Sequence, residues 1–116
     1  MKHYLGVDIG SIGTKGVIVT VAGEIVAQAA RAHRMQVPEP GWAEHDADQD
    51  WWGDFVFVTK KMLAESGIAP SSIAAIGASG IGPCMLPVDV DGNPLMNAVL
   101  YGVDTRAARE IEDMTQ

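Results

Sequence analysis

The fold is decided by Asp8-Ile9-Gly10-Ser11-Ile12-Gly13-Thr14-Lys15, a stretch that joins two short apolar runs. Residues 4–8 form the first run, which ends in a carboxylate in the pattern of a buried strand. Residues 15–21 form the second run and are rich in the β-branched residues that favour strands. Gly10 and Gly13 lie between the runs, where a tight turn needs residues that tolerate positive φ. The stretch therefore predicts a β-hairpin with a carboxylate at the end of one strand and a cation at the start of the next.

Outward from this hairpin, the chain carries further strand and helix signals. Residues 24–34 predict a third antiparallel strand. Apolar residues at steps of four, three and four predict a helix over 46–65 that stops at Gly67. This stripe consists of Trp51, Phe55, Val58 and Met62. Residues 74–79 then predict a strand parallel to the first, because a strand–helix–strand crossover joins parallel strands. A last helix is predicted from Thr105, as its cap, to the end of the chain. The fold class is α/β: an antiparallel three-strand meander extended by a parallel strand, with helices packed on the sheet.

The composition indicates one globular domain and excludes several classes of function. The chain has 116 residues, of which 47% are apolar, enough for one hydrophobic core. A formal net charge of −7 with only 8 Lys and Arg residues leaves no basic face for a nucleic acid. The single cysteine, Cys84, excludes an intrachain disulfide and a zinc cluster. No apolar run approaches the roughly 18 residues that span a bilayer, and no signal peptide is recognised. We therefore expect no membrane contact and a cytoplasmic location.

The hairpin also combines the groups that hold a magnesium-bound polyphosphate. Glycines let backbone amides approach phosphate oxygens without a Cβ in the way, and hydroxyls and a cation add donors. The residues expected at the phosphates are Gly10, Ser11, Gly13, Thr14 and Lys15. Asp8 is expected to hold Mg²⁺ through water, because this ion keeps much of its hydration shell. The residues alone leave an ordinary hairpin turn as the alternative.

Two commoner phosphate-binding motifs do not fit this stretch. The P-loop requires Gly-Lys, whereas Thr14 separates Gly13 from Lys15. The dinucleotide fingerprint opens a helix, whereas these glycines lead into a predicted strand.

Three stretches together resemble the FGGY family of carbohydrate kinases, whose members include xylulokinase and glycerol kinase. Residues 6–15 are similar to the first phosphate loop of the family, which all actin-like ATPases share. Gly41-Trp42-Ala43-Glu44-His45-Asp46, followed by Trp51-Trp52, is similar to the loop before the family's first helix. Residues 89–95 and Asp104-Thr105-Arg106 are similar to the segment that ends in a Trp-x-Asp-x-Arg pattern. The three occur in matching order over essentially the whole chain.

The resemblance implies a fold, a reaction and a set of contacts. The fold would be the ribonuclease H-like, actin-like ATPase domain. Residues 1–116 would be the N-terminal part of its first domain, without the remainder of that domain or the second one. The reaction would transfer the γ-phosphoryl group of ATP to a hydroxyl of a sugar or polyol, a pentulose such as xylulose. Asp8 would bind the Mg²⁺ of MgATP, and the hairpin residues above would face its phosphates. The residues implied at the sugar are Gly80, Ile81, Gly82, Pro83, Asp104 and Arg106.

The resemblance also implies limits. The general base and the adenosine-binding loops of the family would lie beyond residue 116, so the chain by itself is expected to be inactive. The full-length protein would bind a small-molecule substrate and could form a homodimer. Tyr101-Gly102 replaces the Trp expected before Asp104. The segment 80–84 lacks the Met-His of xylulokinases and the Arg-Glu of glycerol kinases, which leaves the sugar open.

Two other functions remain open at this point. An actin-like module that binds nucleotide without phosphorylating a substrate would carry the same hairpin, but not residues 41–46 together with 104–106. A stand-alone domain with an incidental turn would be indifferent to MgATP.

A few further residues receive structural expectations. His3 and His45 are expected at the surface or in loops, since no second imidazole or thiol lies at metal-ligand spacing. Trp51 is expected in the core, because it lies on the helix stripe. Trp42 is left open between packing and contact with a sugar.

Overall fold

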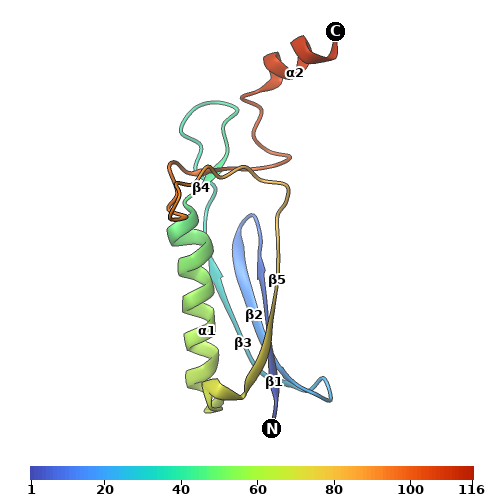
Figure 1. The fold of residues 1–116 in the computed structure, drawn as a ribbon, viewed down its shortest axis with the longest axis vertical. Coiled ribbons are helices and arrows are strands. Elements are labelled where there is room, and N and C mark those ends of the chain that lie inside the picture. The colour runs from blue at the N-terminus through green and yellow to red at the C-terminus, as the bar shows by residue number, and fades with distance from the viewer.

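The computed structural model describes residues 1–116 and shows a four-stranded sheet with one long helix against it (Figure 1). The sheet contains β1 (His3–Ile9), β2 (Gly13–Thr20), β3 (Ile25–Ala32) and β5 (Ile73–Gly80), in the order β3-β2-β1-β5. β1 and β2 pair antiparallel, as do β2 and β3, whereas β5 runs parallel to β1. The predicted meander extended by a parallel strand is therefore confirmed.

The long helix begins with a π-helical segment, η1 (Ala47–Trp52), and continues as α1 (Gly53–Ser66). Asp46 caps its start, because the Asp46 carboxylate accepts a hydrogen bond from the Gln49 amide at 2.9 Å. Gly67 ends the helix with a φ of 69°, in the left-handed region that glycine adopts without strain. The predicted helix and its stop are confirmed.

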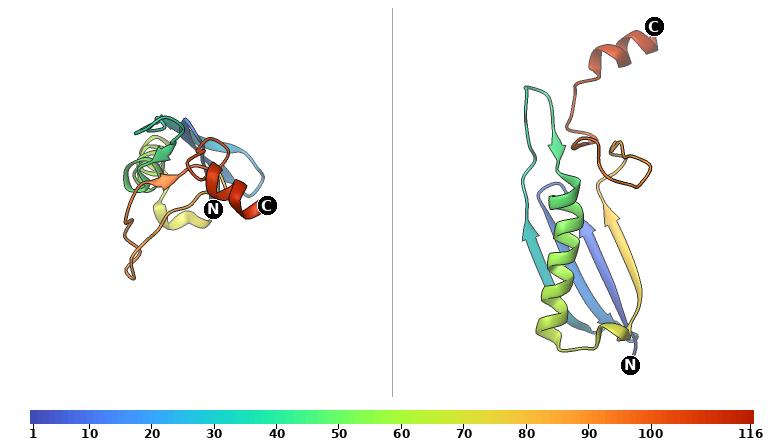
Figure 2. Two further views of the ribbon diagram at one scale, coloured as in Figure 1. Left: turned by 90° about the horizontal axis from the view of Figure 1, so that it is seen from above. Right: turned by 60° about the vertical axis from the view of Figure 1, so that its left-hand side comes forward.

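One face of the sheet packs on α1 to form the hydrophobic core. Side chains alternate along a strand, so every second residue of β1 and β2 points to the helix. The buried core residues are Leu5, Val7, Ile18, Ala29, Val58 and Met62. Gly16 lies in the same row, where an added Cβ would come 2.6 Å from Met62 Cε. The other sheet face carries exposed side chains, among them Tyr4, and Figure 2 shows α1 on one face alone.

The remaining elements lie around the two ends of the sheet. They are β4 (Glu44–His45), β6 (Ala98–Val99), η2 (Pro70–Ser72) and α2 (Ala108–Thr115). β4 and β6 pair antiparallel in a separate small sheet, and α2 extends away from the rest of the chain (Figures 1 and 2). The prediction that Thr105 caps α2 is wrong. Its hydroxyl donates to the Gly41 carbonyl at 3.1 Å, and the helix begins at Ala108. None of the helices has the length and apolar character needed to cross a bilayer.

Candidate functional site

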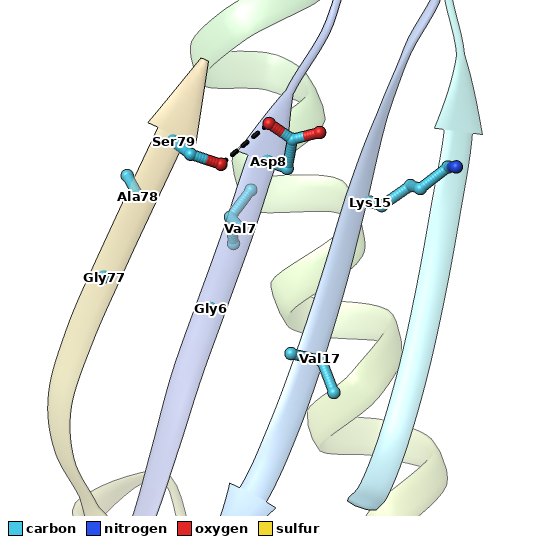
Figure 3. Close-up of a pocket in the computed structure, with 8 residues that line it drawn as sticks. All are labelled: Gly6, Val7, Asp8, Lys15, Val17, Gly77, Ala78 and Ser79. Carbon is cyan, nitrogen blue, oxygen red and sulfur yellow. Dashed lines mark hydrogen bonds between the residues drawn. The ribbon is translucent and has the colours of Figure 1, made fainter.

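Asp8 and Lys15 lie next to each other at the end of the β1–β2 hairpin, on the sheet face opposite α1 (Figure 3). They are partners in the antiparallel register, and both residues are exposed. Ser79 of β5 donates its hydroxyl hydrogen to Asp8 Oδ1 at 2.7 Å, which orients the carboxylate and leaves Oδ2 without a partner. A hollow of about 450 Å³ opens at these residues. It is lined by Gly6, Val7, Asp8, Lys15, Val17, Gly77, Ala78 and Ser79.

The turn of the hairpin presents two unpaired backbone donors. The Gly10 amide is used internally, because it donates to the Gly13 carbonyl at 2.8 Å. The amides of Ser11 and Ile12 have no acceptor within the chain, and the Ser11 hydroxyl is also without a partner. A Cβ at Gly13 would lie 2.9 Å from the Arg31 carbonyl oxygen, so the approach of β3 requires glycine here. The turn therefore offers N–H groups to a ligand at its tip.

The structure adds Arg31, which sequence analysis missed, to this region. Arg31 lines a second hollow of about 330 Å³ together with Asp8, Gly10 and Lys15. Its Nε lies 3.5 Å from Asp54 Oδ1, and its guanidinium stacks 4.6 Å from the Phe57 ring centroid. The sequence alone does not place Arg31 here, because its position opposite Thr14 follows from the β2–β3 register of the structure.

The Thr14 hydroxyl does not face the ligand side of the hairpin, and the expectation that it donates to phosphate is corrected. Thr14 is fully buried, and its hydroxyl donates to Asp54 Oδ2 at 2.9 Å. Thr14 belongs to the row of β2 residues that points to α1, where Asp54 is the nearest acceptor. The contact of Gly10, Ser11, Gly13 and Lys15 with the phosphates stays a prediction.

The residues predicted at the sugar fall into two places. Gly80 and Ile81 line a hollow of about 130 Å³ beside Trp51. Pro83 lines a hollow of about 530 Å³ that also contains Asp104 and Arg106. Gly82, between them, lines neither. Their contact with a substrate stays a prediction.

Asp104 and Arg106 form a closed cluster with the loop before the helix. Arg106 Nη2 lies 2.7 Å from both Glu44 Oε2 and Asp104 Oδ2, and its guanidinium lies 4.0 Å from the Trp42 ring centroid. Asp104 Oδ2 also accepts the Ala43 amide at 2.8 Å. The Arg106 side chain, hydrogen-bonded to this carboxylate, lowers the pKa of Asp104 to about 2. Trp42, left open by the sequence, is therefore a stacking partner of Arg106.

The expectation that His3 and His45 lie at the surface or in loops is wrong, because His3 belongs to β1 and His45 to β4. His3 is 7% exposed and His45 is completely buried. His3 Nδ1 lies 2.9 Å from Ser72 Oγ, at the opposite end of the sheet from the hairpin. His45 instead lies behind the hairpin turn, and burial lowers its pKa. Both buried imidazoles have hydrogen-bond partners, Ser72 and Ser11, that lie far away in the sequence and could not be predicted from residue spacing.

The fold and the hairpin together define a class. An antiparallel meander extended by a parallel strand, with a carboxylate and a glycine-rich turn at the end of its first strand, is the beginning of an actin-like ATPase domain. Residues 3–116 match the model of the FGGY family of carbohydrate kinases, N-terminal domain, and the chain belongs to this family. The resemblance noted from three stretches of sequence is confirmed.

Individual relatives agree with this assignment. The chain is 39% identical over 100 residues to glycerol kinase from Trichormus variabilis, covering 85% of this chain and 20% of the relative. The crystal structure of xylulose kinase from Rhodospirillum rubrum matches with a TM-score of 0.87 and 27% identity, over 98% of this chain and 23% of that one. Glycerol kinase from Plasmodium falciparum, solved with ADP, shares the fold at a TM-score of 0.84 and 23% identity, over 99% of this chain and 23% of that one. The chain thus spans about a fifth of the length of the curated relatives it matches.

Proposed function

We propose that this chain supplies the phosphate-binding hairpin of an ATP-dependent kinase that phosphorylates a hydroxyl of a sugar or polyol. The observation that carries the proposal is the hairpin itself, where the unpaired amides of Ser11 and Ile12 lie in the turn between the register partners Asp8 and Lys15. Membership of the carbohydrate kinase family supports the class of acceptor.

The groups at the hairpin fit a magnesium-bound triphosphate. Anionic phosphate oxygens accept hydrogen bonds from unpaired amides and from an ammonium group, and both are present. Asp8 Oδ2 is free to hold Mg²⁺ directly or through water. One carboxylate is sufficient for this ion, because water and phosphate oxygens complete its shell. When bound, MgATP would supply the phosphoryl group, and the residues of this chain would orient its phosphates.

The first candidate substrate is a pentulose such as xylulose. The segment 80–83, of which Gly80 and Ile81 lie beside Trp51, contains only glycine, isoleucine and proline, so it offers main-chain and apolar contacts without a charge. In the hollow of about 530 Å³ that Pro83 lines, the charge of Arg106 is already balanced by Asp104 and Glu44. A neutral acceptor therefore fits both places better than an anionic sugar acid.

The test is a substrate screen with the full-length protein that carries this chain. Release of ADP from MgATP is measured with xylulose, ribulose, glycerol and gluconate as acceptors, and a pentulose is expected to give the highest kcat/KM. Nucleotide binding without turnover on any acceptor would favour an actin-like binding module instead. Absence of nucleotide binding would overturn the proposal.

A matched pair of variants tests the hairpin directly. Lys15→Ala is expected to weaken MgATP binding by about 10-fold, because a charged hydrogen bond to phosphate is lost. Lys60→Ala removes an exposed lysine from α1 and is expected to leave binding unchanged. Equal affinities of the two variants, measured by calorimetry, would contradict the assigned position of the phosphates.

A further inference from the structure

Two buried imidazoles hold the hairpin turn from inside the domain. His33 Nε2 lies 2.8 Å from the Gly10 carbonyl oxygen, and His45 Nε2 lies 3.0 Å from the Ser11 carbonyl oxygen. The two rings meet edge to face with centroids 4.6 Å apart. His33 directly follows β3 and His45 belongs to β4, so two segments from outside the hairpin contact consecutive residues of its turn.

The hydrogen-bond partners fix which nitrogen donates. The indole Nε1 of Trp51 is a donor only, and it donates to His45 Nδ1 at 3.1 Å. His45 therefore carries its proton on Nε2 and donates it to Ser11. Burial lowers the pKa of His45, which favours the same neutral form. His33 donates from Nε2 as well, because the Gly10 carbonyl can only accept.

These two bonds set the direction of the free amides. In a planar trans peptide unit, the carbonyl of one residue and the amide of the next point in opposite directions. Since the Gly10 carbonyl is held toward the interior, the Ser11 amide points outward. The Ser11 carbonyl is held in the same way, so the Ile12 amide also points outward. These are the two amides of the turn that have no acceptor within the chain.

We propose that His33 and His45 are positioning residues, which fix the peptide units of the turn with their amides directed at the phosphates of the nucleotide. The inference rests on the proposed function of the hairpin and adds to it the groups that preorganise it. Donors that are already oriented bind an anion without the cost of ordering them at the moment of binding.

The imidazoles are themselves held in place. Asp54 is 1% exposed, lies 2.7 Å from His33 Nδ1 and accepts the Thr14 hydroxyl. Trp51 holds the other ring through its indole nitrogen. Turning either ring would therefore break a second buried hydrogen bond, which keeps both Nε2 atoms on the turn.

The test uses the full-length kinase with MgADP as the binding probe and with MgATP and the best acceptor in kinetics. His45→Phe is expected to raise the Kd for MgADP and the KM for MgATP by about 3- to 10-fold, with the KM for the acceptor unchanged. His45→Gln retains a donor for Ser11 and is expected to recover most of the affinity. His3→Phe is the matched control, because it removes another buried, hydrogen-bonded imidazole at the far end of β1. It is expected to lower the Tm without changing the affinity for nucleotide.

A spectroscopic readout is independent of turnover. In histidine-selective ¹⁵N NMR of the kinase, His45 is expected as the neutral tautomer with its proton on Nε2. If His45→Phe does not fold, His33→Phe applies the same test at Gly10. A wild-type protein that binds no MgADP would refute the proposed function. A wild type that binds MgADP, with His45→Phe or His33→Phe binding it equally well, would refute the positioning role alone.

Discussion

Replacing Gly16 with alanine is expected to destabilise the protein through one identifiable overlap between sheet and helix. The new Cβ would lie 2.6 Å from Met62 Cε and 3.2 Å from Val58 Cγ2. Carbon atoms in contact normally lie about 3.5–4.0 Å apart. Met62 and Val58 are both completely buried, so Met62 has to retreat by about 1 Å within a closely packed core.

The magnitude follows from opposing terms. Inserting a methyl group into a packed core costs about 1–3 kcal/mol. Alanine in a strand recovers about 0.5–1 kcal/mol relative to glycine, because the unfolded chain loses less entropy on folding. The net loss from Gly16→Ala therefore reaches up to about 2.5 kcal/mol. Met62→Ala alone is expected to cost about 2–5 kcal/mol through the cavity that it leaves.

A double-mutant cycle decides whether the overlap is the cause. In Gly16→Ala/Met62→Ala, the new methyl group enters space that Met62 has vacated, so the combined loss should fall below the sum by at least about 0.5 kcal/mol. The measurement is equilibrium urea unfolding of the wild type, the two single variants and the double variant, compared when all four have the same m-value. Gly77→Ala, where a Cβ would meet nothing within 4 Å, is the control and should not lose stability. Strict additivity of the two single losses would refute the reasoning.

Three further predictions concern caps and titrating groups. Gly67→Ala places a Cβ at a φ of 69° and should cost about 1–2 kcal/mol in urea unfolding. His45 has a lowered pKa in the folded protein, so its contribution to stability is complete above the unfolded value of 6.5 and is lost as pH falls through the lowered folded value. His45→Gln should flatten this dependence of the urea midpoint on pH. The pKa of Asp104 is lowered from 3.8 to about 2, so its contribution is present above pH 3.8 and is lost as pH falls through about 2. The difference in Tm between wild type and Asp104→Asn should therefore shrink over that interval, and a constant difference would contradict the pairing with Arg106.

Local patterns were sufficient to predict the elements of the sheet and the helix against it. Glycines between two apolar runs indicate a turn, and Gly67 after a periodic stripe indicates a helix end, because both depend on a few neighbouring residues. The reason given for the turn was wrong, however, since neither Gly10 nor Gly13 adopts a positive φ. The direction of β5 followed from the crossover connection. Thr105 does not cap the helix, because its hydroxyl donates to the carbonyl of Gly41, 64 residues earlier in the chain. Capping preferences describe only neighbouring residues, so they do not predict a hydrogen bond to a distant part of the chain.

The groups behind the hairpin could not be predicted for the same reason. His33 and Asp54 lie 21 residues apart, and Thr14 and Asp54 lie 40 apart, so no local spacing connects them. A histidine in a predicted loop is expected at the surface, whereas His45 is buried by contacts with Trp51 of η1 and with the hairpin turn. Thr14 illustrates the converse. A hydroxyl next to two glycines suggests a phosphate donor, but strand alternation turns it to the helix side.

The three stretches that carry the family resemblance are one physical unit in this structure. Arg106 pairs with Glu44, and Asp104 accepts the amide of Ala43, so the third stretch holds the loop of the second. The residue after Glu44 is His45, whose imidazole holds the Ser11 carbonyl of the first stretch. Asp104 and Arg106 thus have a structural reason to occur with this hairpin whether or not they touch a substrate. An acidic residue and an arginine far along the chain hold β4, the strand whose His45 contacts the Ser11 carbonyl of the hairpin turn.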